Sequence, residues 1–207
     1  GLNALQANTT GSGNTANGVN ALQSNISGID NIAIGQNALV GNTTGSYNVG
    51  IGEVAGADNT TGEYNISIGK QAMQRKQTGD YNVAVGAASI DQITSGQYNA
   101  VLGSLAGRYY GIGSGNNLTT AMNNSILIGY NTRPLINSSS NEIVIGASAI
   151  GNGANTTTIG GTSTTDTYLK GNVHVSNALK ISGGTPGDGK VLTSDANGLA
   201  SWETPAS

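Results

Sequence analysis

Glycine recurs at every seventeenth position along the first half of the chain and limits what the chain can fold into. The spacing is unbroken through Gly1, Gly18, Gly35, Gly52, Gly69, Gly86 and Gly103. Asparagine keeps the same spacing at Asn14, Asn31, Asn48, Asn65, Asn82 and Asn99, and Tyr47, Tyr64, Tyr81 and Tyr98 each precede one of these residues. A fixed period of this length is typical of a repeat architecture, in which each unit stacks on its neighbours.

Each repeat carries a short strand just before its glycine. In Asn82-Val-Ala-Val-Gly86, branched residues alternate with a small one, and the same pattern recurs at Ile32/Ile34, Val49/Ile51 and Ile66/Ile68. Alternation with a period of two predicts a strand with two different faces. The Asn-Thr-Thr-Gly stretches predict turns. With apolar pairs such as Ala21-Leu22 as a second strand, we expect an all-β β-solenoid (β-roll) of 17-residue coils.

The spacing slips after Gly103. The next matching glycines are Gly129, Gly146 and Gly160, so one long step is followed by a regular step and then by a shorter one. We therefore expect a solenoid shaft over residues 1–160, with an insertion near 107–124, and a separate β unit over 161–207. In that unit, Thr167–Val175 and Leu179–Ser182 are expected to be strands. Val191–Ser194 and Leu199–Trp202 flank an Asn-Gly loop and predict a hairpin.

Charge and composition exclude several kinds of partner. Charged residues make up 9% of the chain, the net charge is −3 and cysteine is absent, so neither disulfides nor Cys-ligated metals are possible. No basic stripe exists to neutralise phosphates, which argues against nucleic acid. No apolar run is long enough to insert into a membrane. Because each coil supplies few apolar side chains, one chain encloses a thin core, and we hypothesise that three copies associate.

The repeats resemble a known family. The units Gly18–Gly28 and Gly35–Gly45, with Tyr-Asn-Val-Ala-Val-Gly strands, resemble the head repeats of trimeric autotransporter adhesins and, more closely, repeats of tailed-phage fibres. The resemblance implies a homotrimer of parallel left-handed β-rolls over about residues 1–160. Gly189–Trp202 resembles a segment near the C-terminal ends of phage and bacterial fibre proteins. Such fibres are often cleaved after a Ser, and Ser207 fits that pattern.

Few residues suggest chemistry. His174 is the single histidine, and the carboxylates do not recur at a fixed offset, so we expect no catalytic residue, metal or cofactor. Four Asn-x-Thr/Ser sequons share the period of the glycines, at Asn8, Asn25, Asn42 and Asn59. They would be glycosylated in a eukaryotic secretory pathway. For a bacterial or phage protein, we favour the interpretation that they form turns.

Two features are candidates for binding. The tyrosine column at 47, 64, 81 and 98 is interpreted mainly as a stacking ladder that stiffens the rod, with a platform for sugars as the alternative. The insertion contains Arg108, Tyr109 and Tyr110, residue types that are enriched at contact hot spots. These three residues are the candidate receptor-binding site. Equally, the insertion could cover a junction or lock neighbouring chains.

The function expected from these features is structural and adhesive. We expect an extracellular segment of a longer trimeric fibre, on a virion or a bacterial cell surface, that attaches to a surface receptor, with a carbohydrate as the candidate receptor. One alternative is a carbohydrate-active fibre such as a depolymerase, which needs two facing carboxylates. Another is an ice-binding solenoid, which needs a regular Thr ladder on a strand. The Thr pairs of this chain, such as Thr43-Thr44, lie instead in the expected turns.

Overall fold

The computed structural model describes residues 1–112, 117–161, 163–170, 172–177, 180, 187–194 and 200–205. These residues form strands and turns without a helix, which confirms the all-β prediction. The chain divides into two compact units, residues 1–167 and residues 168–207. The first unit thus extends past residue 160, where the solenoid was expected to end.

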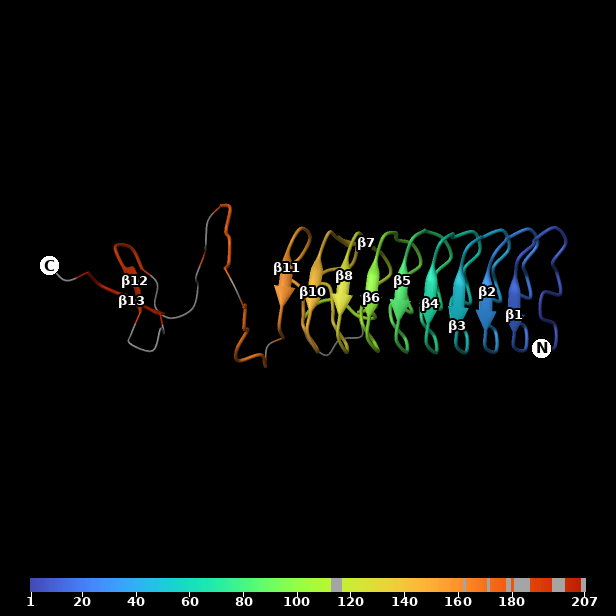
Figure 1. The fold of residues 1–207 in the computed structure, drawn as a ribbon, viewed down its shortest axis with the longest axis horizontal. Helices are drawn as coiled ribbons and strands as arrows, with labels where there is room; N and C mark the ends of the chain where they lie inside the picture. Colours follow the sequence, from blue (N-terminus) through green and yellow to red (C-terminus); the bar gives the residue numbers. More distant parts are fainter. Residues whose placement is uncertain are drawn as a thin grey trace. The chain divides into compact units, whose positions relative to one another are not determined.

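The first unit is a β-solenoid. Its nine-stranded sheet is parallel throughout, with one strand from each successive coil, and Figure 1 shows these strands side by side in a row. The strands are β1 (Thr15–Asn17), β2 (Ile32–Ile34), β3 (Val49–Ile51), β4 (Ile66–Ile68), β5 (Val83–Val85), β6 (Ala100–Leu102), β8 (Ile126–Ile128), β10 (Ile143–Ile145) and β11 (Thr157–Ile159). This arrangement confirms the solenoid of stacked coils.

The register follows the glycine spacing. Ala33 of β2 pairs with Gly50 of β3, which is one regular step along the chain. Val101 of β6 pairs with Leu127 of β8 across the long step, and Val144 of β10 pairs with Thr158 of β11 across the short one. The predicted break after Gly103 is therefore confirmed, and the longer coil absorbs the insertion without interrupting the sheet.

The expectation of two strands in every coil is wrong. The Ala-Leu segments form consecutive turns, in which Asn20 and Leu22 have positive φ angles of 58° and 52°. Two left-handed residues so close together prevent an extended backbone. The hydrogen bonds nevertheless run to the next coil, since the Leu22 N–H donates to the Ala38 carbonyl at 3.0 Å. Among the described residues, a second pair of parallel strands forms only at β7 (Met122–Asn123) and β9 (Ser139–Ser140), and single parallel bridges join Ser95 to Ala121 and Arg133 to Ile150.

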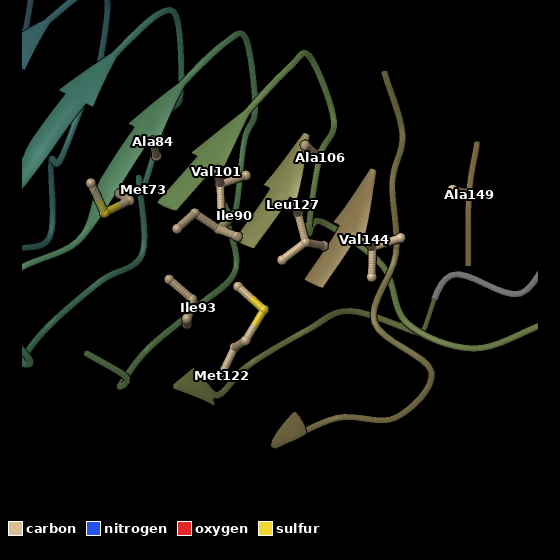
Figure 2. Packing of buried hydrophobic residues seen from close by; sticks show 10 residues of the cluster. All are labelled: Met73, Ala84, Ile90, Ile93, Val101, Ala106, Met122, Leu127, Val144 and Ala149. Atoms are coloured by element: carbon tan, nitrogen blue, oxygen red, sulfur yellow. The ribbon is translucent and has the colours of Figure 1, made fainter. Parts of the chain in front are cut away.

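The middle residue of each strand faces the interior, and in the earlier coils this residue is small. Ala33 is completely buried, and so are Leu22 and Ala38 beside it. The large residue of one coil fills the space that a small residue leaves, because a Cβ added to Gly50 would lie 2.8 Å from Leu39 Cγ. In the later coils, the strands supply the large residues, and Figure 2 shows Val101, Leu127 and Val144 in one buried cluster with Ile90 and Met122.

The second unit contains an antiparallel hairpin. Strands β12 (Val191–Ser194) and β13 (Ala200–Glu203) pair with Leu192 opposite Trp202, which confirms the predicted hairpin, and its loop lies outside the described residues. The described parts of Thr167–Val175 contain no strand, so that prediction is wrong. The physical reason is that a strand needs a neighbouring strand for its backbone hydrogen bonds, and this segment of alternating apolar and polar residues has none within the described residues. The segment expected at Leu179–Ser182 lies outside the description apart from Lys180.

Candidate functional site

The glycine column is where neighbouring coils approach most closely. Gly69 has a φ angle of 121°, and a Cβ added to it would lie 2.7 Å from the carbonyl carbon of Gly86. Gly86 has a φ angle of 136°, and an added Cβ would lie 2.4 Å from the Gly103 carbonyl oxygen. The same close approach recurs at Gly18, Gly35, Gly52 and Gly103. The backbone conformation and the missing side chain both require glycine here, which explains the strict spacing.

The asparagines that precede the strands form a buried ladder. Asn31 Nδ2 donates to Asn14 Oδ1 at 3.1 Å and to the Gly45 carbonyl at 2.9 Å, and the Asn31 N–H also donates to Asn14 Oδ1. Similar ladder contacts continue through Asn48, Asn65, Asn82 and Asn99. Identical side chains in successive coils thus satisfy each other's polar groups inside the solenoid.

The sequon asparagines form a second column. Asn25, Asn42 and Asn59 are at most 2% exposed, and each side-chain amide donates to the asparagine one coil before it at 2.8 Å. Each also donates to the glycine carbonyl three residues later, which closes its turn. Glycosylation needs an exposed asparagine, so this geometry favours the turn interpretation.

Lys76 ends the second asparagine column. It occupies the position one coil after Asn59, is 1% exposed, and donates through Nζ to the carbonyls of Thr78 and Gly79. Burial lowers the pKa of Lys76 from 10.5 to about 8, which the negative charge of Asp80 partly opposes. Asn59 Oδ1 is left buried without a hydrogen-bond partner among the described residues. The change from Asn to Lys therefore leaves the ladder incomplete.

The four tyrosines stack along the rod. The ring centroids of successive members Tyr47, Tyr64, Tyr81 and Tyr98 lie 4.7, 5.0 and 5.2 Å apart, and the ring planes are within 10° of parallel. The inner rings therefore cover each other's faces and present edges and hydroxyls to solvent. A sugar would stack on a ring face, so this geometry favours the stiffening ladder over the sugar platform.

The insertion folds as a hairpin within the longest coil. Tyr109 bridges to Leu118 in antiparallel fashion, and the N–H of Tyr110 donates to the Asn117 carbonyl at 2.9 Å. The Thr119 N–H donates to the Arg108 carbonyl at 2.9 Å. Residues 113–116 lie outside the described part of the chain. Antiparallel pairing thus holds the three predicted receptor-binding residues at the base of this hairpin.

The predicted residues are partly engaged within the chain. The Arg108 guanidinium lies 3.5 Å from Asp91 Oδ2, and its central carbon lies 5.4 Å from the centroid of the Tyr109 ring. The central guanidinium carbon of Arg133 lies at the same distance from that ring. Arg108 and Tyr109 therefore help to fix the hairpin base, as the junction interpretation expects, while Ile112 further along is largely open to solvent at 84% exposure.

Asp91 is buried at this junction with incomplete hydrogen bonding. Its side chain accepts a hydrogen bond from Gln92 Nε2 at 3.0 Å, and burial raises its pKa although Gln92 and Arg108 act in the opposite direction. Asp91 Oδ1, Arg108 Nε and Thr119 Oγ1 are buried without a hydrogen-bond partner among the described residues. Three buried polar atoms without a hydrogen-bond partner among the described residues thus lie around the insertion.

Sequence reasoning missed Asp91, Arg133 and Glu142. Glu142 is buried in the position of the first asparagine column, where Gly153 N–H donates to its Oε1 at 2.9 Å and Ser139 donates to its Oε2. The long step leads from Asn99 to Ser125 and a regular step leads on to Glu142, so counting through the insertion would have found it. The same long step places Arg133 one coil from Gly107.

The remaining chemical candidates show no assembled site. His174 is exposed in the second unit. Across the described residues, no three His, Cys, Asp or Glu side chains are grouped closely enough to hold a metal ion. That part of the chain also holds no apolar helix of membrane-spanning length.

Comparisons with known proteins do not assign the chain to a family. A scan against protein-family models, a search of curated proteins and a search of solved structures each find no match. The chain is therefore classified by its fold alone, which is a β-solenoid followed by a hairpin.

Proposed function

We propose that this chain is a structural and adhesive segment of a trimeric fibre, carried outside the cell on a virion or a bacterial surface. The observation that carries the proposal is the outer face of the nine-stranded sheet. Its outward positions hold branched residues in nearly every coil, and Ile34, Leu102 and Ile128 are 40%, 52% and 37% exposed. Parallel sheets are ordinarily covered on both faces.

The inward-facing residues already fill the interior of the solenoid, so the outward-facing side chains cannot be buried there. The outward branched residues are Ile32, Ile34, Val49, Ile51, Ile66, Ile68, Val83, Val85, Leu102, Ile126, Ile128, Ile143, Ile145 and Ile159. Side chains of this size and exposure present on the order of 800 Å² per chain, which is what one partner contributes to a standard interface. Identical straight rows on identical chains favour self-association around a common axis.

The trimer is tested by measuring mass in solution with light scattering. We expect three chains per particle for the unmodified protein, and monomers for the double variant Ile51→Lys/Ile68→Lys, which places charges in the middle of the outer face. The matched control is Ala87→Lys. Ala87 is exposed one coil after Lys70, at the equivalent position, so the control should remain trimeric. A monomeric unmodified chain would contradict the proposal.

The adhesive part of the proposal rests on the hairpin, which interrupts an otherwise regular surface. Binding hairpins and loops on rigid scaffolds are common. The unmodified trimer should bind members of an array of surface glycans. The double variant Tyr109→Ala/Tyr110→Ala should lose that binding while its mass stays trimeric. Unchanged glycan binding by this variant would show that the hairpin serves only as a junction.

A further inference from the structure

All three arginines of the chain gather beside the hairpin. Arg75, Arg108 and Arg133 follow the column glycines Gly69, Gly103 and Gly129 by six, five and four residues, so they occupy the same turn of nearby coils. The Arg75 N–H donates to the Asp91 carbonyl at 3.0 Å, and Arg108 contacts the Asp91 carboxylate from the other side. Two acidic residues share this turn, Asp91 and Asp58, and Asp58 lies one coil before Arg75 at the equivalent position, so three positive charges face two negative ones.

Two guanidinium groups, those of Arg75 and Arg108, act on one carboxylate, that of Asp91. With Arg133 and Asp58 included, the three arginines outnumber the two carboxylates, so this turn has a net positive charge although the chain as a whole has a net charge of −3. Arg108 is about one quarter exposed, at 28%, and Arg75 is exposed. Guanidinium groups stay charged at all physiological pH values, and their planar donors match carboxylate and sulfate oxygens.

Aromatic support adds to this arrangement. The Tyr109 ring lies 5.4 Å from the central carbons of both the Arg108 and the Arg133 guanidinium groups. Cation–π contacts of this kind hold a guanidinium in place without neutralising its charge. The base of the hairpin therefore presents positive groups in fixed positions, which lowers the entropic cost of binding a ligand.

We propose that this turn and the hairpin base bind an anionic group, a carboxylate or a sulfate, carried by a surface polysaccharide. The inference rests on the proposed adhesive function and gives the chemical class of its receptor. Because the chain is acidic overall, a polyanion is expected to bind here and to be repelled elsewhere.

Asp91 is the group that competes with such a ligand for Arg108. The charged and titratable groups around it are Arg75 from the preceding coil and Arg108 from the following coil. Since burial raises the pKa of Asp91, this carboxyl is protonated at a higher pH than an ordinary aspartate, and its protonation would release Arg108 toward the ligand. Binding should then become tighter as the pH falls, while the arginines keep their charge.

The test measures binding of the unmodified protein to three immobilised polymers by interferometry. The polymers are dextran sulfate, polygalacturonate and neutral dextran, which separate sulfate from carboxylate and both from an uncharged chain. We expect binding to at least one of the two polyanions, weaker binding at higher salt, and none to dextran. Equal binding to neutral dextran, or no binding to either polyanion, would overturn the proposal.

The variant Arg75→Gln/Arg133→Gln should weaken polyanion binding at least tenfold. It removes the contact of Arg133 with Tyr109 but leaves the Arg108–Asp91 pair and the contact of Arg108 with Tyr109 in place, so these two contacts still hold the hairpin base. The matched control, Lys70→Gln/Lys190→Gln, removes the same charge elsewhere and should change binding less than twofold. An equal loss in the control would show general electrostatic attraction instead of a site.

Light scattering on every variant separates this inference from the proposed function. A trimer that binds neutral glycans through the hairpin, but no polyanion, would contradict the ligand class alone. A monomeric unmodified protein would contradict the fibre proposal whatever the result with polyanions.

Discussion

The coils before Gly103 and the coils after it share one strand geometry but satisfy their buried polar groups differently. In the earlier coils, Asn bonds to Asn across each regular step. In the later coils, the same column holds Ser125 and Glu142, each with its own contacts. The strand pairing therefore requires only the spacing, whereas the hydrogen bonds between side chains within the ladder require the same residue in every coil.

The unpaired buried atoms follow this difference. Asn59 Oδ1 lies where one ladder stops, and the other three such atoms among the described residues belong to Asp91, Arg108 and Thr119 around the insertion. A column of identical residues satisfies both its donors and its acceptors at every step except the last. Each break in the repeat therefore carries a free-energy cost that the regular coils avoid.

The largest expected effect comes from the glycine column. Gly69→Ala places a Cβ 2.7 Å from the backbone of Gly86 at a φ angle of 121°, so we expect the solenoid to lose roughly 3–4 kcal/mol of unfolding free energy. The measurement is denaturant unfolding followed by far-ultraviolet circular dichroism.

The control for this substitution is Gly111→Ala in the insertion. Gly111 also has a positive φ, 80°, but its nearest neighbour would be the Leu135 carbonyl oxygen at 3.5 Å. We expect a loss of only about 1 kcal/mol there. Equal losses at the two glycines would mean that conformation alone, without close approach of the coils, determines the spacing.

The next prediction compares an asparagine of the first column in the earlier coils with the serine that takes its place in the later coils. Asn65→Ala removes an amide that bonds to Asn48, Gly79 and Asn82, so we expect a cost of about 2–3 kcal/mol. Ser125→Ala removes two hydrogen bonds, to Asn123 and from Glu142, and should cost about 1 kcal/mol. Thermal unfolding of both variants at one pH measures the difference, and a larger loss at Ser125 would contradict the comparison.

A smaller change than the losses at Gly69 and Asn65 is expected where a substitution restores a broken ladder. Lys76→Asn would let residue 76 donate to Asn59 Oδ1, and it removes a buried cation whose pKa is about 8 in the folded chain against 10.5 unfolded. The unfolded chain therefore binds more protons between these two pKa values. Stability should rise as the pH increases from about 8 to 10 and stay level below that range.

We expect the Lys76→Asn variant to lose this slope and to be roughly 2 kcal/mol more stable than the unmodified chain at pH 7. Chemical unfolding at pH 7, 8.5 and 10 measures both quantities. Lys76→Met, which removes the charge without restoring the ladder, separates the two contributions. A slope that persists in both variants would assign the pH dependence to other groups.

The parts of the fold that depend on identical residues could be predicted from the sequence. The stacked glycines have to coincide in space, so their spacing indicated the strands, the register and the break after Gly103. The second strand was wrongly predicted because nothing in Ala21-Leu22 indicates that Leu22 adopts a left-handed conformation. Leucine rarely adopts it, and here contacts with the next coil impose it.

The candidate site was only partly visible in the sequence. The insertion and its residues Arg108 and Tyr109 were found because they interrupt the period. Asp91 and Arg133 were missed because they join the site through the stacking of coils, not through proximity in the chain. The sequence also could not show which face of the strands lies outside, since both faces carry apolar residues. The volume inside the coil determines which of the two faces is turned inward.

The direction of the hydrogen bonds between coils has a mechanical consequence. These bonds run along the stack, so a pull on the two ends of the solenoid loads the coil interfaces in series, one after another. Within each interface the bonds act together, so a coil resists until all of its bonds break at once. Each regular coil that detaches then releases 17 residues, or about 60 Å of extended chain. The coil with the hairpin releases 26. Such a segment would lengthen under load in discrete steps and would absorb energy at each one.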